Sequence, residues 1–99
     1  MPKFVVSLRL PALFNQEFIA LIPSHWALIQ QLIEDHVIET YAISADRTRG
    51  WITMNGNDAA AVQAVVEQFP LYSFITEVEI DELFIFESAK TRFPRLSLN

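Results

Sequence analysis

The chain has 99 residues, of which 52% are hydrophobic and only two are glycine, and this is typical of one folded domain. Two domains and a disordered chain are therefore excluded. The absence of cysteine excludes disulfides, a thiolate nucleophile and cysteine-based zinc or iron–sulfur sites. The formal net charge of -5 argues against nucleic acid as a partner, because phosphates need a concentrated positive surface.

Residues 3–10 alternate between an apolar face and a more polar one, which is the period of a half-buried strand. Pro11 ends this strand. Arg9 and Pro11 also interrupt the first apolar run before any small-residue cleavage site, so we expect no signal peptide. No window approaches the roughly 20 apolar residues that a membrane span needs. We therefore expect a cytoplasmic protein without a membrane partner.

From about Asn15 to about His36 the apolar spacing is helical. A first short apolar arc is followed by a longer one that includes Trp26 and Ile29. Pro23 separates the two arcs, and because proline lacks an amide hydrogen we expect the helix to bend or restart there. His36 falls at the carboxyl end, where a positive charge is favoured, and we interpret it as the helix end.

Two β-rich segments follow at residues 37–43 and 50–55, and the polar loop SADRTRG between them predicts a hairpin. Asn57 or Asp58 then offers an oxygen to the open amides of a second helix, which we expect to reach Phe69 before Pro70 closes it. Residues 74–82 alternate as a last strand, and 83–86 extend it or begin a short one. Residues 88–99 show no clear period and are expected to be a tail or arm.

The order strand, helix, strand, strand, helix, strand predicts a single α+β domain over residues 1–99. This is the ferredoxin-like βαββαβ arrangement, a four-stranded antiparallel sheet with two helices on one face. The side chains expected to meet the helices are Phe4, Val6, Leu8, Ile38, Ala42, Ile52, Met54, Val78 and Ile80. The opposite face is expected to carry Val5, Tyr41, Ile43, Trp51 and Ile75. Large apolar groups on an uncovered face predict a homodimer or higher homo-oligomer formed through the sheets.

The stretch from Ala60 to Leu83, AAVQAVVEQFPLYSFITEVEIDEL, resembles the muconolactone isomerase family of bacterial aromatic degradation. In that family a helix likewise ends in a Leu-Pro-Leu type turn, and an aromatic-rich loop and an acidic strand follow. The resemblance extends back to about Phe18, over roughly two thirds of the chain. It implies a ferredoxin-like chain that pairs with a second copy as a dimeric α+β barrel.

The family reaction, as the resemblance implies it, moves a double bond within a lactone ring by proton transfer, without a cofactor. Such chemistry needs a base near the ring, a donor or cation for the developing enolate oxygen, and a cation for the substrate carboxylate. Where the family has charged helix residues, including a glutamate, this chain has Ser24, His25, Trp26 and Ala27, and the family's loop histidine corresponds to about Arg47. The resemblance therefore implies His25 as the candidate catalytic residue and Arg47 as the candidate anion anchor. The absent glutamate indicates a substrate other than muconolactone.

Four aromatic residues are candidates for the substrate-binding cavity: Trp26, Tyr41, Trp51 and Phe74. Each also has a purely structural interpretation. Trp26 is compatible with the core, Tyr41 and Trp51 with a subunit interface, and Phe74 with packing of the second helix against the sheet end.

His25 and the loop arginines also have alternative interpretations. His25 is also compatible with a partly buried residue bonded to a backbone carbonyl. Arg49 is a second candidate for the anion, and a solvated side chain is the ordinary state of either Arg47 or Arg49. His25 and His36 lie three helical turns apart, which excludes a metal shared by the two within one chain. We expect neither a metal nor a cofactor.

The leading functional hypothesis is a cofactor-independent isomerase that acts on a small, mostly apolar lactone or carboxylate. One alternative is a non-catalytic binding or assembly module that keeps the fold. Another is a cofactor-free monooxygenase that takes polycyclic phenols into a shaped aromatic pocket.

Overall fold

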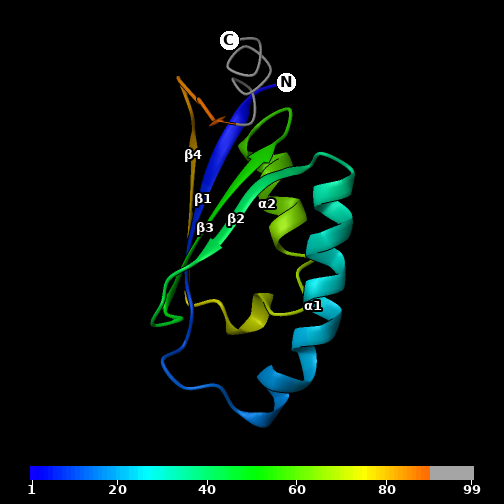
Figure 1. Ribbon diagram of the computed structural model, residues 1–99, viewed down its shortest axis with the longest axis vertical. Coiled ribbons are helices and arrows are strands. Elements are labelled where there is room, and N and C mark those ends of the chain that lie inside the picture. Colours follow the sequence, from blue (N-terminus) through cyan, green and yellow to red (C-terminus); the bar gives the residue numbers. More distant parts are fainter. Residues whose placement is uncertain (90–99) are drawn as a thin grey trace.

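The computed structural model describes residues 1–89, which form one sheet with two helices on one of its faces (Figure 1). The elements are β1 (Lys3–Arg9), α1 (Gln16–Glu34), β2 (Ile38–Ile43), β3 (Arg49–Asn55), α2 (Ala59–Val66), the 3-10 helix η1 (Tyr72–Phe74) and β4 (Glu77–Glu82). The strand order is β2-β3-β1-β4, and all neighbouring strands are antiparallel. The predicted ferredoxin-like α+β fold is confirmed. None of the helices in this range is long and apolar enough to cross a membrane. The tail expected at 88–99 falls almost entirely outside the described residues.

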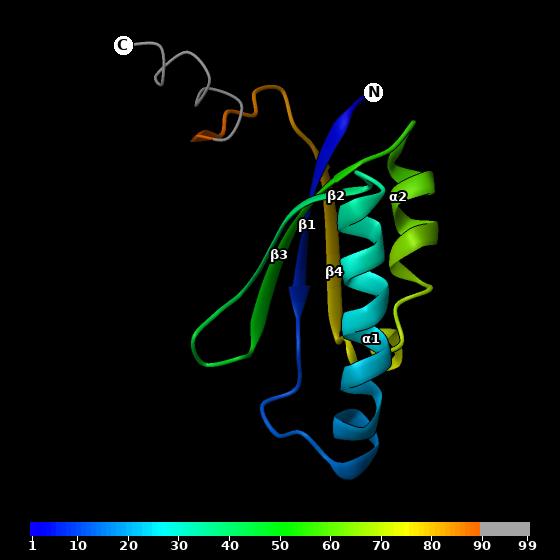
Figure 2. The same ribbon diagram turned by 45° about the vertical axis from the view of Figure 1, so that its right-hand side comes forward.

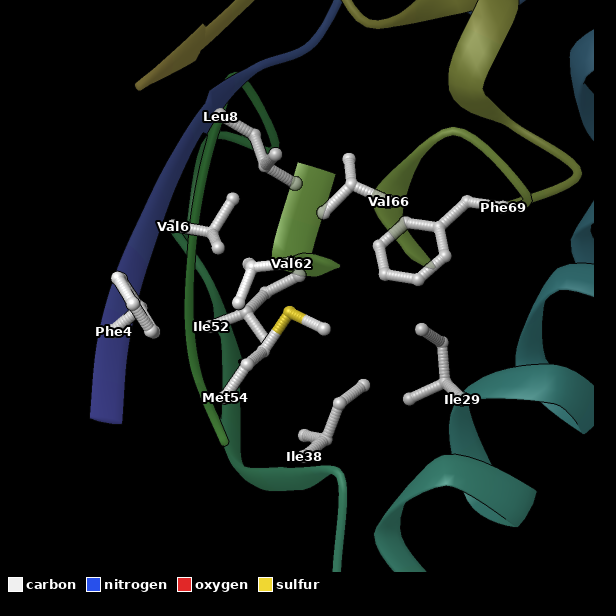
Figure 3. Packing of buried hydrophobic residues seen from close by; sticks show 10 residues of the cluster. All are labelled: Phe4, Val6, Leu8, Ile29, Ile38, Ile52, Met54, Val62, Val66 and Phe69. Carbon is white, nitrogen blue, oxygen red and sulfur yellow. The ribbon is translucent and has the colours of Figure 1, made fainter. Parts of the chain in front are cut away.

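The hydrophobic core lies between the sheet and the helix layer. The turned view shows both helices on the same side of the sheet (Figure 2). Ten buried apolar side chains fill the space between the layers (Figure 3) and are Phe4, Val6, Leu8, Ile29, Ile38, Ile52, Met54, Val62, Val66 and Phe69. Since alternate residues of a strand point to opposite faces, β1 buries every second side chain. Full burial of one such side chain stabilises the fold by about 1.5–3 kcal/mol.

Helix α1 begins at a cap and continues through its internal proline. The side chain of Asn15 accepts a hydrogen bond from the amide of Phe18 at 2.8 Å, which satisfies one of the open amides of the first turn. Pro23 lies inside the helix. The helical region predicted from about 15 to 36 is therefore one continuous helix, and it does not restart at Pro23.

The carboxyl end of α1 is a left-handed cap at His36, whose φ is 60°. The amide of His36 donates to the carbonyl of Ile33, and the amide of Val37 donates to the carbonyl of Leu32. This pair of bonds is a Schellman motif, which satisfies carbonyls that the helix leaves open. The interpretation of His36 as the helix end is confirmed.

The second helix and the last strand are shorter than expected. Asp58 is the cap of α2 and accepts from the amide of Ala61 at 2.8 Å. The helix ends at Val66, and a tighter turn that places Phe69 in the core replaces its predicted last residues. Residues 72–74 form η1, so β4 begins at Glu77, and residues 83–86 form no strand.

A β-bulge reverses the predicted orientation of the second half of β2. Ile38 pairs with Met54, but Thr40 pairs with Thr53, so β2 has one extra residue between these pairs. Because side chains alternate, one inserted residue moves every later side chain to the other face. Tyr41 and Ile43 therefore lie on the helix side of the sheet, opposite Ile52 and Gly50. Ala42, predicted to be buried, is exposed.

The outer face of the sheet is less apolar than predicted. Tyr41 and Ile43 are not on it, and Ile75 precedes β4 and packs against the core instead. Trp51, 38% exposed, is the large aromatic residue that remains there, and the guanidinium carbon of Arg49 lies 5.3 Å from the centre of its ring. The dimer through the sheets stays a prediction.

The two glycines provide a matched test of packing around the core. A methyl group on Gly56 would lie 2.7 Å from a methyl group of Val62, a stiff and buried side chain of α2. We expect Gly56→Ala to lower the free energy of unfolding by about 1–3 kcal/mol, the usual effect of overpacking. The free energy is measured by urea unfolding.

Gly50→Ala is the control. The methyl group added there would lie 3.0 Å from the terminal carbon of the Ile43 side chain, which is flexible and able to move. We expect Gly50→Ala to lower the free energy of unfolding by less than Gly56→Ala does. Equal losses at the two positions would contradict the role assigned to the contact with Val62.

Candidate functional site

A cavity of about 250 Å³ is lined by residues of α1, β2, the β1–α1 loop, the β2–β3 turn and the segment before η1. Figure 1 shows these two connections and η1 at the same end of the sheet. The lining residues of the cavity are Leu10, Phe14, Phe18, Ile22, His25, Trp26, Tyr41, Ile43, Arg47 and Leu71. Four of the six residues proposed from the sequence are thus brought together here: His25, Trp26, Tyr41 and Arg47. The lining is otherwise apolar, which is typical of a small-molecule site with a few polar groups.

His25 reaches the cavity from the middle of α1. It lies seven residues after Phe18 and four before Ile29, so all three share the buried face of the helix. Its side chain is 7% exposed, and its Nε2 lies 3.1 Å from the hydroxyl oxygen of Tyr41. Its Nδ1 is buried and has no hydrogen-bond partner among the described residues. The partner of His25 is therefore a side chain on the sheet, in place of the backbone carbonyl considered from the sequence.

Aromatic rings surround the His25–Tyr41 pair. The ring of Phe69 stands almost perpendicular to the imidazole, with centroids 5.4 Å apart. Trp26, which is half exposed, makes a similar edge contact with Tyr41 at 5.8 Å. These contacts fix the two rings of the pair against hydrocarbon and limit their contact with water.

Burial shifts both groups of the pair toward their uncharged forms. It lowers the pKa of His25 below the ordinary value of 6.5 and raises the pKa of Tyr41 above 10.0, since a charged form loses its hydration there. At neutral pH the cavity wall therefore presents a neutral imidazole joined to a protonated phenol. Such a pair is able to donate or accept hydrogen bonds without a fixed charge.

Arg47 brings a permanent charge to the edge of this cavity from the β2–β3 turn. The carboxylate of Asp46 organises the turn by accepting hydrogen bonds from the hydroxyl of Ser44 and from the hydroxyl and amide of Thr48. These bonds, that of the Thr48 hydroxyl first, lower the pKa of Asp46 to about 2. Arg47 follows with a φ of 65°, and its guanidinium carbon lies 5.9 Å from the ring centre of Phe14. The turn therefore holds a cation beside an apolar cavity.

Two residues proposed from the sequence lie outside the cavity lining. Trp51 is on the outer face of the sheet, beside Arg49. Phe74 is in η1 and makes an edge contact with Phe18 at 5.3 Å, so it lies behind the cavity wall. Arg49, the alternative anion anchor, also points away from the cavity.

Sequence reasoning left five lining residues unassigned: Leu10, Phe14, Phe18, Ile22 and Ile43. The helical spacing of Phe18, Ile22 and His25 was a usable signal, because it puts them on one helix face. Ile43 was hidden by the bulge, and no local pattern distinguishes Phe14 in its irregular loop. Within residues 1–89 there is no cluster of three or more His, Asp or Glu side chains suited to a metal ion.

No protein-family model matches the sequence, and no curated protein matches it. Solved structures that resemble the chain include the following two. One is 5-chloro-2-hydroxyhydroquinone dehydrochlorinase from Burkholderia phenoliruptrix AC1100, in complex with 2,5-dihydroxybenzoquinone: the identity is 12%, the TM-score 0.55, and the match covers 90% of this chain and 97% of that one. The other is a candidate antibiotic biosynthesis monooxygenase from Deinococcus radiodurans, with 14% identity, a TM-score of 0.48 and coverage of 89% and 95%. At 12% identity the likeness to the dehydrochlorinase is one of fold, and the closer resemblance to muconolactone isomerases stays a prediction.

The buried imidazole has a measurable effect on stability. Because the folded-state pKa of His25 is lowered, the unfolded chain binds a proton there before the folded chain does. We expect the free energy of unfolding to fall as the pH drops below about 6.5, and to stop falling once the folded His25 is protonated. His25→Gln should remove this part of the pH dependence. The measurement is urea unfolding between about pH 8 and about pH 5, a range that includes the ordinary pKa of histidine.

Tyr41→Phe is the matched control, since it keeps the buried imidazole and should keep the pH dependence. Asp46 does not interfere with this measurement. Its pKa is lowered from 3.8 to about 2, so its effect on the free energy of unfolding changes mainly below pH 3.8. Identical pH profiles for the wild type and His25→Gln would show that His25 is not buried as described.

Proposed function

We propose that this chain is a cofactor-independent enzyme that binds a small, mostly apolar lactone or ring carboxylate and shifts a proton within it. The observation that carries the proposal is the His25–Tyr41 pair, which lies at 3.1 Å on the wall of an otherwise apolar cavity. Perturbed titratable groups that meet in a cavity are a recognised mark of acid–base sites.

A proton shift beside a carbonyl builds negative charge on the carbonyl oxygen. Catalysis then needs a group that exchanges the proton and a donor for that oxygen, and both act more strongly in surroundings of low polarity. The pair supplies these groups, and His25 is its candidate proton-transfer residue. Arg47 is the candidate anchor for a substrate carboxylate, and Trp26 and Tyr41 shape the cavity.

The size of the cavity favours a substrate with one ring. An apolar cavity of roughly 150 Å³ holds a benzene molecule. The volume of about 250 Å³ therefore has room for one ring with its substituents. The dehydrochlorinase with the same fold was solved with 2,5-dihydroxybenzoquinone, a compound with one oxygenated ring, and this supports the same ligand size.

The test is proton exchange. Small unsaturated lactones and ring carboxylates are incubated with the protein in deuterated water, and deuterium at carbons next to the carbonyl is followed by proton NMR. We expect exchange that depends on the protein and falls by about 100-fold or more in His25→Gln, because positioned acid–base groups contribute at least this much. Arg47→Gln should raise KM for carboxylates by about tenfold or more, the loss of a charged hydrogen bond.

Trp51→Phe is the control, because Trp51 lies on the other face of the sheet. The deuterium exchange rate with this variant should match that of the wild type. Ligand-induced changes in the fluorescence of Trp26 without any exchange would favour the non-catalytic binding module. Oxygen uptake with phenols would favour the monooxygenase. A rate that His25→Gln leaves unchanged would refute the assignment of His25.

A further inference from the structure

The two ring nitrogens of His25 have different surroundings. Nε2 lies 3.1 Å from the hydroxyl oxygen of Tyr41. Nδ1 is buried, and no group in residues 1–89 lies at hydrogen-bond distance from it. A neutral imidazole carries one proton and one lone pair, so one of the two nitrogens must donate and the other accept.

The buried nitrogen is the less suitable place for the proton. A proton on Nδ1 would be a buried N–H donor without an acceptor, which is rare in folded proteins. A proton on Nε2 finds an acceptor at once in the Tyr41 oxygen. The lone pair is then left on Nδ1, which is buried and has no partner among the described residues.

This arrangement determines where the hydroxyl proton of Tyr41 points. When the Tyr41 oxygen accepts from His25, its own proton has to be directed elsewhere. His25 is the one hydrogen-bond partner of the Tyr41 hydroxyl in the described part of the chain, and Tyr41 lines the cavity. The raised pKa of Tyr41 keeps this hydroxyl protonated. The free donor is therefore available to a molecule in the cavity.

We infer that Tyr41 is the member of the pair that contacts the ligand, as a hydrogen-bond donor to a carbonyl, enolate or carboxylate oxygen, and that His25 is a positioning residue which holds the Tyr41 oxygen through Nε2–H. The inference rests on the cavity of the proposed function and describes the bound state before any proton moves. The proton transfer proposed for His25 requires the other tautomer, in which Nε2 accepts from the Tyr41 hydroxyl. The inference adds a requirement to the ligand: an acceptor oxygen on the ring, separate from any carboxylate held by Arg47.

The direction of the hydrogen bond between His25 and Tyr41 follows from which ring nitrogen of His25 carries the proton. Two-bond proton–nitrogen NMR correlation on the wild-type protein at neutral pH separates a protonated from an unprotonated ring nitrogen. The expected result for His25 is a protonated Nε2 and an unprotonated Nδ1. A proton on Nδ1 overturns the inference.

The donor role of Tyr41 is tested with two molecules of matched shape, cyclohexanone and methylenecyclohexane, which differ in one carbonyl oxygen. Binding is followed through Trp26 fluorescence. We expect Tyr41→Phe to weaken the binding of cyclohexanone by roughly threefold to tenfold, the effect of one hydrogen bond. The affinity for methylenecyclohexane should stay unchanged. Equal weakening of both compounds, or wild-type protein that does not bind cyclohexanone, overturns the inference.

Two variants of His25 separate positioning from bulk packing. His25→Leu removes the donor to Tyr41 and should weaken the binding of cyclohexanone as much as Tyr41→Phe does. His25→Gln keeps an amide donor on the side chain and should bind cyclohexanone more tightly than His25→Leu. Equal affinities in the two variants would count against the positioning role. Because these measurements use binding and no turnover, they can succeed when proton exchange is absent, and so they separate this inference from the proposed function.

Discussion

Between Ile38 and Thr40 the pairing of β2 with β3 shifts by one residue, and the site depends on that shift. In a strand with unbroken alternation Tyr41 would face away from the helices and from His25. The bulge turns Tyr41 and Ile43 toward α1, where one contacts the imidazole and both line the cavity. Bulges often occur beside functional sites because they redirect a side chain without changing the rest of the sheet.

The regular parts of the fold could be predicted from residue periodicity. The alternation of β1, the helical spacing from Asn15 and the hairpin around Asp46 each follow from local sequence, and so does their βαββαβ order. The bulge could not be predicted, because VIETYAI alternates equally well in either register and only the pairing with β3 selects one. The continuous course of α1 through Pro23 has the same origin, since tertiary packing of the helix face outweighs a local preference.

The same reasoning explains the mixed outcome for the candidate site. His25 was found because its position on the helix could be compared with the family that the sequence resembles, and Trp26 and Arg47 line the same cavity in the folded chain. Tyr41 was named for its aromatic ring and expected on the wrong face, whereas its hydroxyl is the feature that meets His25. A hydrogen bond between residues on a helix and a strand depends on register, which composition and spacing do not contain.

The cavity combines uncharged donors inside with a charge at its edge, and the β2–β3 turn maintains that separation. A φ of 65° at Arg47 costs a side-chain-bearing residue of order 1 kcal/mol or more, so glycine or asparagine is the usual occupant. The turn tolerates arginine because Asp46 holds the flanking Ser44 and Thr48 through three hydrogen bonds. The cation thereby stays beside Phe14 without entering the apolar interior, where desolvation would oppose it. A carboxylate held at this edge would direct the rest of a small ring inward, toward the Tyr41 hydroxyl.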